Sequence, residues 1–282
     1  MEIIRTITAM RLRLATENNT ALVPTMGNLH AGHLELIRVA REKTGAAGCV
    51  VVSIFVNRLQ FAPHEDFATY PRTLEHDCAR AAEAGADIVF APDEHELYPV
   101  AQQFLVEPSP LQHLLDGAVR PGHFRGVATV VLKLFNIVLP QVAVFGKKDY
   151  QQCRVLADMV RQFNLPVAMV FANTVRAPDG LALSSRNGYL SDAERLEAPR
   201  LFALLSGIEA ELQAGNRDYA GLEAAGLSRL EKHGWRPDYL RILRAGDLQV
   251  PESTTTDLVV LAAARLGATR LIDNIEVRRV LK

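Results

Sequence analysis

The architecture of this chain follows from one stretch, Thr20-Ala-Leu-Val-Pro-Thr-Met-Gly-Asn-Leu-His30-Ala-Gly-His33-Leu34. Its first five residues form a short apolar run closed by turn residues, which is typical of a buried strand. A turn containing Gly27 follows, and His30-Ala-Gly-His33 then opens a helix expected over residues 34–43. The stretch therefore predicts a strand, a turn and a helix, with two histidines on neighbouring positions of one helical face.

The same alternation of strand and helix continues up to about residue 175. Residues 49–56 form a nearly continuous β-branched run, as in a strand buried on both faces. This alternation predicts a parallel sheet covered by helices on both faces. Ligands of such sheets bind outside the carboxyl ends of the strands, so the strand-to-helix junctions should carry the chemistry. We expect further strands at 86–90, 142–145 and 167–171, and further helices at 73–84, 127–139 and 150–163.

The pattern changes after residue 175. Ser191-Asp-Ala-Glu194 is a capping box, which predicts a helix running to about Gln213. A second helix is expected over 219–233, followed by strands at 239–243, 258–262 and 270–272. Because 282 residues allow about two domains, we expect an α/β domain over residues 1–174 and a smaller α+β domain over 175–282.

Composition excludes several classes of protein. With 49% hydrophobic and 22% charged residues the chain is globular rather than disordered. A net charge of -1 provides no basic field for nucleic acid or acidic membranes. The three cysteines form no CxxC pair, which indicates a reducing compartment and no structural zinc. No apolar run reaches a membrane span and no signal peptide is recognisable, so we expect a cytoplasmic protein.

The two histidines stand where a helix N-terminus makes an anion site. Free backbone N–H groups and the helix dipole attract negative charge there, and Gly32 lets a ligand approach the backbone. His30 and His33 could donate to phosphate oxygens as charge develops on a leaving group. Two other interpretations remain: one histidine caps the helix while the other is a surface residue, or both bind zinc, for which no third ligand stands at a recognisable spacing.

Three further junctions carry polar residues. The amides of Asn57 and Gln60 follow the β-branched run and suit a small polar substrate, although amides there also form turns. Arg120 and Arg125 lie in a rigid turn and could bind phosphate or carboxylate, or be solvated.

A solvated loop and helix face are expected over Asp66 to Arg72, with His76 and Asp77. The third junction combines a glycine, two lysines and a helix start in Gly146, Lys147, Lys148, Asp149 and Gln152.

The loop from Arg176 to Asn187 lies where the two expected domains join. Ser184 and Ser185 are followed by Arg186 in a segment with a flanking glycine, which could wrap a triphosphate. Such a position suits a lid that closes over its ligand. Together with the HxGH turn upstream, this loop resembles the KMSKS-type loop that accompanies HIGH-type motifs in nucleotidylyltransferases and class I aminoacyl-tRNA synthetases.

Six stretches in order resemble one family, the pantothenate synthetases or pantoate–β-alanine ligases. The stretches are PTMGNLHAGH, SIFVNRLQF, YPRTLEHD, RPGHFRGVATVVLKLFN, FGKKDYQQ and RAPDGLALSSRN, and the C-terminal LIDN segment agrees as well. The resemblance implies a Rossmann-like α/β fold of the HxGH nucleotidylyltransferase type over 1–174, which binds ATP and pantoate, and a C-terminal α+β lid domain over 175–282. It also implies that the protein is a homodimer, that ATP is a substrate and that Mg²⁺ is the metal ion required.

The resemblance further implies a two-step reaction. Pantoate attacks ATP to give pantoyl adenylate and pyrophosphate, and the amine of β-alanine then displaces AMP. His33 would donate a proton and His30 would stabilise phosphates, with Lys148, Ser184, Ser185 and Arg186 neutralising charge. The implied ATP contacts are Met26, Gly27, His30, Gly32, His33, Gly146, Lys147, Lys148, Asp149, Val175, Leu183, Ser184, Ser185 and Arg186, and the implied pantoate or β-alanine contacts are Asn57, Gln60, Arg120 and Gln152.

Three positions depart from the family pattern. Arg58 stands where proline is common, Lys147 where glutamate is frequent, and Ala31 where an acidic residue is frequent. None of them removes a matched catalytic group. The alternatives are an adenylyltransferase that stops after nucleotide transfer and a nucleotide-sensing or nucleic-acid-binding module. A dehydrogenase is disfavoured because no G-x-G-x-x-G follows the first expected strand.

Overall fold

A computed structural model describes residues 1–63 and 65–279. The described residues form two compact units: one comprises Met1–Lys147 and Val155–Asn173, the other Lys148–Arg154 and Thr174–Lys282. We call them unit 1 and unit 2. The functional division into an ATP- and pantoate-binding domain and a lid at residues 174 and 175 stays a prediction.

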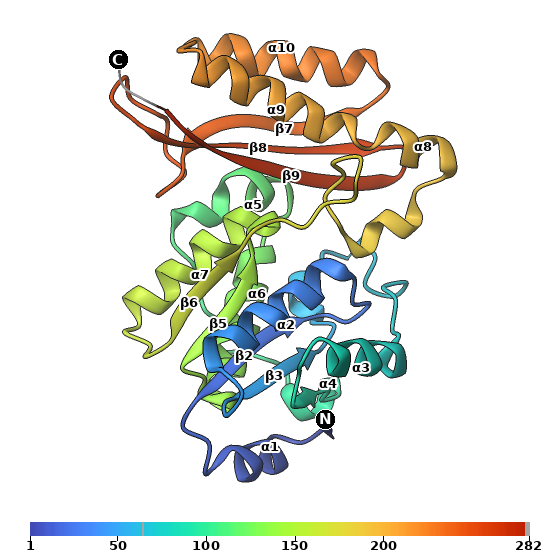
Figure 1. Cartoon of the computed structure of the whole chain (residues 1–282), viewed down its shortest axis with the longest axis vertical. Coiled ribbons are helices and arrows are strands. Elements are labelled where there is room, and N and C mark those ends of the chain that lie inside the picture. Colours follow the sequence, from blue (N-terminus) through green and yellow to red (C-terminus); the bar gives the residue numbers. More distant parts are fainter. Residues whose placement is uncertain (64, 280–282) are drawn as a thin grey trace. The chain divides into compact units, whose positions relative to one another are not determined.

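Unit 1 contains a six-stranded parallel sheet (Figure 1). The central strands β2 and β3 are buried along almost their whole length, which confirms the interpretation of their apolar runs. The strand order is β1-β4-β3-β2-β5-β6. The strands are β1 (Glu2–Ile4), β2 (Thr20–Thr25), β3 (Cys49–Ile54), β4 (Ile88–Phe90), β5 (Val142–Gly146) and β6 (Ala168–Ala172).

Helices connect these strands and bury their apolar sides against the sheet. Ala21 and Val23 of β2 pack with Leu34 and Ile37 of α2 in one hydrophobic cluster. The helix α6 also packs on β2. The helices are α1 (Ile7–Leu14), α2 (Ala31–Thr44), α3 (Leu74–Glu83), α4 (Glu94–Leu97), α5 (Leu115–Val119), α6 (His123–Val138) and α7 (Tyr150–Gln162). The sequence pattern predicted none of four short elements, which are β1, α1, α4 and α5.

Unit 2 contains a three-stranded antiparallel sheet with helices packed on it (Figure 1). Its core includes Leu205 and Ile208 of α9, Trp235, and Val260 of β8, all at most 5% exposed. The elements are α8 (Asp192–Glu197), α9 (Arg200–Gln213), α10 (Tyr219–Lys232), β7 (Arg236–Arg244), β8 (Asp257–Leu266) and β9 (Thr269–Arg278). These elements confirm the α+β class expected for this part of the chain.

The predicted single helix from Ser191 to Gln213 is wrong in one respect. The capping box of Ser191 and Glu194 is present, but the helix it starts ends at Glu197, and a second helix begins at Arg200. Pro199 stands at the N-cap of this second helix. Ala198 and Pro199 keep helical backbone angles, but Pro199 has no backbone N–H to donate to the preceding turn, which accounts for the break in the hydrogen bonding.

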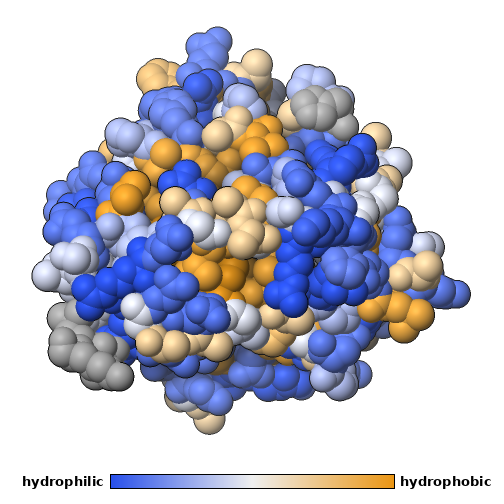
Figure 2. Space-filling view, turned by 90° about the horizontal axis from the view of Figure 1, so that it is seen from above, coloured by the Kyte–Doolittle hydropathy of each residue, from blue (hydrophilic) through white to orange (hydrophobic). Residues whose placement is uncertain are grey.

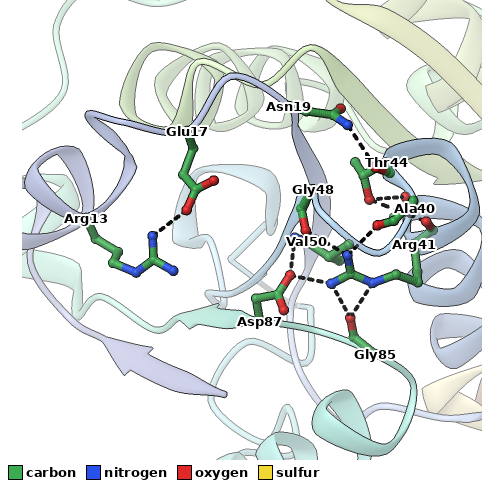
Figure 3. A network of polar contacts seen from close by, with 11 residues as sticks. Arg13, Glu17, Asn19, Ala40, Arg41, Thr44, Gly48, Val50, Gly85 and Asp87 are labelled. Carbon is green, nitrogen blue, oxygen red and sulfur yellow. Dashed lines mark hydrogen bonds and ion pairs between the residues drawn. The ribbon is translucent and has the colours of Figure 1, made fainter.

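A polar network ties together the edge of the unit 1 sheet where β2, β3 and β4 begin (Figure 3). Arg41 donates to the carbonyls of Gly45, Gly48 and Gly85 and forms an ion pair with Asp87. Asp87 in turn accepts from the backbone N–H of Val50 at 2.7 Å. This network lies at the amino ends of the strands, the edge opposite the one where ligands bind in such sheets.

The face seen in Figure 2 is largely hydrophilic, with hydrophobic residues gathered near its middle. Among the described residues, no helix is both long and apolar enough to pass through a membrane.

Candidate functional site

The sheet order of unit 1 creates a topological switch point between β2 and β5. From β2 the chain proceeds to β3 and β4 on one side, whereas β5 and β6 lie on the other. Ligands of parallel α/β sheets bind outside the carboxyl ends of the strands at such a point. Two predicted segments follow these two strands, Met26–His33 after β2 and Gly146–Lys147 after β5. The candidate site of unit 1 is therefore at this switch point.

His30 and His33 cap the helix α2. The Nδ1 atom of His30 accepts from the backbone N–H of Gly32 at 3.2 Å, and that of His33 accepts from the N–H of His30 at 3.3 Å. The two ring centroids are 4.0 Å apart. Because each Nδ1 accepts a hydrogen bond, the neutral rings carry their hydrogen on Nε2, which is a donor. Capping and phosphate recognition are thus compatible roles.

A buried carboxylate holds the turn that leads to the histidines. Asp77 of α3 is 0% exposed and accepts from the backbone N–H groups of Asn28 and Leu29 at 2.8 and 2.7 Å. Gly27 has a left-handed φ of 84°, and a Cβ there would lie 3.0 Å from Asp77 Oδ2. The turn therefore requires glycine at this position.

The interpretation of Asp77 as part of a solvated helix face is wrong. Asp77 lies on the same helical stripe as the buried Ala81 and Ala84, at spacings of four and seven residues. This stripe was the available signal. The buried carboxylate is balanced by two backbone N–H donors and by the hydroxyl of Thr73, which donates to it at 3.1 Å.

Two of the three predicted substrate amides, Asn57 and Gln60, lie together in unit 1. Asn57 is 1% exposed, and its Oδ1 accepts from the hydroxyl of Tyr98 at 2.8 Å. Its Nδ2 donates to Gln60 Oε1 and to the carbonyl of Gly126, each at 3.1 Å. Gln60 Nε2 donates to Met26 Sδ at 3.2 Å. Asn57 therefore orients Gln60, whose amide lies against Met26, the first residue of the predicted nucleotide-binding turn.

Arg120 contacts a carboxylate of the protein. Its guanidinium is bidentate to Glu65 at 2.6 and 2.8 Å and lies 3.0 Å from Nε2 of His123. His123 Nδ1 lies 2.9 Å from the carbonyl oxygen of Gln60. Since a carbonyl only accepts and a guanidinium only donates, the ring is neutral with its hydrogen on Nδ1. Burial and the Arg120 charge lower the pKa of His123 to about 4, which stabilises this form.

The short helix η1 (Arg58–Gln60) lies unusually close to the helix α6. A Cβ on Gly126 would stand 2.2 Å from the carbonyl oxygen of Leu59, so only glycine permits this approach. Arg58, which departs from the family pattern, forms an ion pair with Glu94 at 2.7 Å and stacks over the ring of Phe67. The Arg58 guanidinium is therefore paired with groups on the surface of unit 1.

The other predicted residues belong to unit 2. Lys148 and Asp149 lie in the short helix η3 (Lys147–Asp149), with Lys148 Nζ 3.9 Å from Asp149 Oδ1. Gln152 lies in the first turn of α7. The Ser-Ser-Arg segment follows a hairpin in which the N–H of Leu183 donates to the carbonyl of Val175 at 3.0 Å.

Ser184 begins the short helix η4 (Ser185–Tyr189). Its Oγ accepts from the backbone N–H of Arg186 at 3.3 Å. The predicted nucleotide contacts are thus divided: Met26, Gly27, His30, Gly32, His33, Gly146 and Lys147 lie in unit 1, and Lys148, Asp149, Val175, Leu183, Ser184, Ser185 and Arg186 lie in unit 2. In residues 1–63 and 65–279, no group of three or more His, Cys, Asp and Glu side chains is arranged to hold a metal ion.

The sheet order, the capped HxGH turn and the antiparallel second unit define a Rossmann-like α/β protein with its candidate site at a strand-to-helix junction. The family model for pantoate–β-alanine ligase matches residues 2–276. This chain therefore belongs to the pantoate–β-alanine ligase family.

Several relatives agree over nearly the full length. The chain is 57% identical to a pantothenate synthetase of Nitrosospira multiformis, with 98% of each chain covered. It is 58% identical to one of Chromobacterium violaceum, over 99% of this chain and 100% of the relative. These relatives confirm the family resemblance found in the sequence.

Solved structures confirm the fold. A pantothenate synthetase from Thermus thermophilus superposes with a TM-score of 0.93 at 45% identity, covering 99% of this chain and 100% of that one. A Francisella tularensis pantoate–β-alanine ligase, complexed with beta-gamma ATP and beta-alanine, gives a TM-score of 0.83 at 31% identity, with 98% and 97% covered.

Proposed function

We propose that this chain condenses pantoate with β-alanine to pantothenate, using ATP and releasing AMP and pyrophosphate. Its membership of the pantoate–β-alanine ligase family supports the overall reaction. The observation that carries the site assignment is the HxGH turn, in which both histidines use Nδ1 for the backbone and keep the hydrogen on Nε2. That turn follows β2 at the switch point of the parallel sheet.

The first step forms pantoyl adenylate. The pantoate carboxylate attacks the α-phosphorus of ATP, and the bond to the pyrophosphate leaving group breaks. Two anions must approach each other, so the protein contributes mainly position and neutralising charge. His30 and His33 donate to phosphate oxygens, and Lys148, Ser184, Ser185 and Arg186 neutralise the charge that pyrophosphate carries away.

Gln60 and Gln152 bind pantoate through their amides. The contacts of Asn57 with Tyr98, Gly126 and Gln60 support an indirect role, in which Asn57 holds Gln60 in its binding orientation. Arg120 acts in the same way, because its guanidinium is bidentate to Glu65 and the adjoining His123 contacts the Gln60 carbonyl.

The second step forms the amide. The deprotonated amine of β-alanine attacks the activated acyl carbon, the bond to AMP breaks, and the ammonium proton leaves through water or phosphate. No enzyme nucleophile is required, because the adenylate is already an activated acyl group.

The proposal includes Mg²⁺, which arrives with ATP. Mg²⁺ prefers oxygen ligands and keeps several waters, so the phosphates of ATP supply its main contacts. A homodimer and a cytoplasmic location are also proposed, on the family resemblance. Sedimentation of the full chain with and without ATP tests the dimer.

The reaction is tested with purified full chain, ATP, Mg²⁺ and pantoate, with and without β-alanine, measuring pyrophosphate, AMP and pantothenate. We expect pantothenate only when both acids are present. His33→Ala should lower kcat by about a hundredfold or more, whereas His113→Ala, an exposed histidine outside the site, should not.

Each contrary result has a distinct meaning. Pyrophosphate release without pantothenate would identify an adenylyltransferase. ATP binding without any turnover would identify a nucleotide-sensing module. Full activity of His33→Ala would keep the ligase reaction and remove the role assigned to His33.

A further inference from the structure

The strand β9 of unit 2 carries two adjacent buried polar residues. Asp273 is 4% exposed and Asn274 is 6% exposed. Burying a carboxylate costs free energy unless it is paired, and burial does raise the pKa of Asp273 above its ordinary value. Buried polar groups are stable only where they have hydrogen-bond or ion-pair partners, so the partners of these two residues show what the residues hold in place.

Asp273 holds the base of the hairpin that presents the Ser-Ser-Arg segment. Its carboxylate is bidentate to Arg176, with Oδ2 at 2.6 Å from Nη1 and Oδ1 at 2.9 Å from Nη2. Arg176 also donates to the carbonyl of Gly180 at 3.1 Å, stacks 3.7 Å from the ring centroid of Phe202, and pairs across the hairpin with Ala182. The residue after Ala182 is Leu183, where the predicted nucleotide segment begins.

Asn274 holds the other nucleotide segment of unit 2. Its Nδ2 donates to the backbone carbonyl of Lys148 at 2.9 Å. Adjacent residues of a strand point to opposite faces, so Asp273 and Asn274 can reach two different segments. Glu276 lies on the same face as Asn274 and accepts from the hydroxyl of Tyr150 at 3.2 Å. One contact from this strand therefore holds the backbone of Lys148, and a second holds the side chain of Tyr150 two residues further on.

We propose that Asp273 and Asn274 are positioning residues for ATP: Asp273 through Arg176 and the hairpin that leads to Leu183–Arg186, and Asn274 through the backbone of Lys148. One strand thereby sets the spacing between two sources of positive charge, Lys148 and Arg186. Asn274 contacts Lys148 although the two residues are 126 positions apart along the chain. This inference rests on the proposed function, which assigns these segments to the phosphates of ATP.

The test compares Asp273→Asn and Asn274→Ala with Asp238→Asn. The last variant removes an ion pair to Arg270, 2.6 Å long and in the same sheet, and neither partner is a predicted nucleotide residue. We measure the ATP affinity directly by calorimetry, the KM values for ATP, pantoate and β-alanine, and the melting temperature.

For Asp273→Asn and Asn274→Ala we expect ATP affinity to fall, and the KM for ATP to rise, by about tenfold or more, because anchored charge is lost. In these two variants the KM for β-alanine should stay within about twofold of the wild-type value. In Asp238→Asn the KM values for all three substrates should stay within about twofold. Asp273→Glu, which retains the charge, should recover part of the ATP affinity. If Asp273→Asn or Asn274→Ala does not fold, Asp273→Glu and Asn274→Ser replace them in the comparison with Asp238→Asn.

Equal losses in all parameters, or an ATP affinity that falls only as far as in Asp238→Asn, would overturn the positioning role. If the wild type binds ATP but makes no pantothenate, the proposed reaction fails while the affinity comparison still decides this inference. If the wild type binds no ATP, both proposals fail.

Discussion

At the scale of single residues, buried polar groups hold the candidate site in place. Asp77 fixes the turn before the HxGH histidines, and Asn57 fixes the amide of Gln60. Both are at most 1% exposed. A buried group whose hydrogen bonds are all made has a single favourable orientation, so these residues make the site rigid.

Lys147 stands in the glycine-to-helix junction where the family frequently has glutamate. We expect Lys147→Glu to leave kcat within about tenfold, because the assigned phosphate charge is on Lys148. Steady-state pantothenate formation measures this, with Lys148→Glu as the control that should lose activity by orders of magnitude. Complete inactivation by Lys147→Glu would instead assign Lys147 a specific role.

His123 should make the stability of the protein depend on pH. Its folded-state pKa is about 4 against an ordinary value of 6.5, so between these values the unfolded chain binds more protons. Stability from this residue is therefore present above about pH 6.5 and is lost as the pH falls toward 4, by about 2 kcal/mol between pH 7 and 4.5.

Urea unfolding at the two pH values measures this contribution. His123→Asn keeps a donor for the Gln60 carbonyl but does not titrate. The wild type should therefore lose more stability on acidification than the variant. Identical losses in the two proteins would show that the ring does not titrate between these values.

At the scale of elements, periodicity identified most helices and strands but not their ends. The buried strands β2 and β3 have continuous apolar runs and the helix α2 begins at a clear turn, so all three were predicted. The strand β1 has three residues and pairs with β4, a partner far along the chain, so its local pattern carries little signal. Pro199 acts locally and was available as a signal, since a proline ends a helix or begins one.

The helix α2 is tied to the strand starts by Arg41, which donates to three backbone carbonyls and pairs with Asp87. We expect Arg41→Met to lower the free energy of unfolding by about 2 kcal/mol, because partly buried carbonyls lose their donor. kcat should be unchanged, since the network lies at the opposite edge of the sheet.

Arg38→Met in the same helix is the matched control. Arg38 pairs with Glu35, but the two side chains are 55% and 44% exposed. Exposed pairs contribute little, so this variant should stay within about 0.5 kcal/mol of the wild type. Equal destabilisation by both variants would contradict a larger contribution of the Arg41 network.

At the scale of the whole molecule, the residues assigned to ATP come from both units. A ligand that binds only the folded protein stabilises it by mass action. ATP with Mg²⁺ at about a hundred times its dissociation constant should thus raise the free energy of unfolding by about 2.7 kcal/mol.

Arg186→Ala tests this coupling. At the same ATP concentration the increase in stability should be smaller in the variant than in the wild type, each protein compared with its own stability without ATP, because one phosphate contact is lost. Denaturant unfolding with and without ATP measures both quantities. An equal gain in the two proteins would exclude Arg186 from the nucleotide site.

Local periodicity and contiguous motifs were enough to predict the parallel α/β class, the α+β class of the second part and the family, because each of these is recorded in neighbouring residues of the chain. Apart from Asp77, whose place on a buried helical stripe is readable from the sequence, the supports of the motifs became visible only in the folded protein; they are Glu65, His123, Asp273 and Asn274. Their roles depend on burial and on partners as far as 126 residues away. Hydrogen bonding of a buried group is a property of the packed chain, and no local pattern specifies which distant backbone group it will meet.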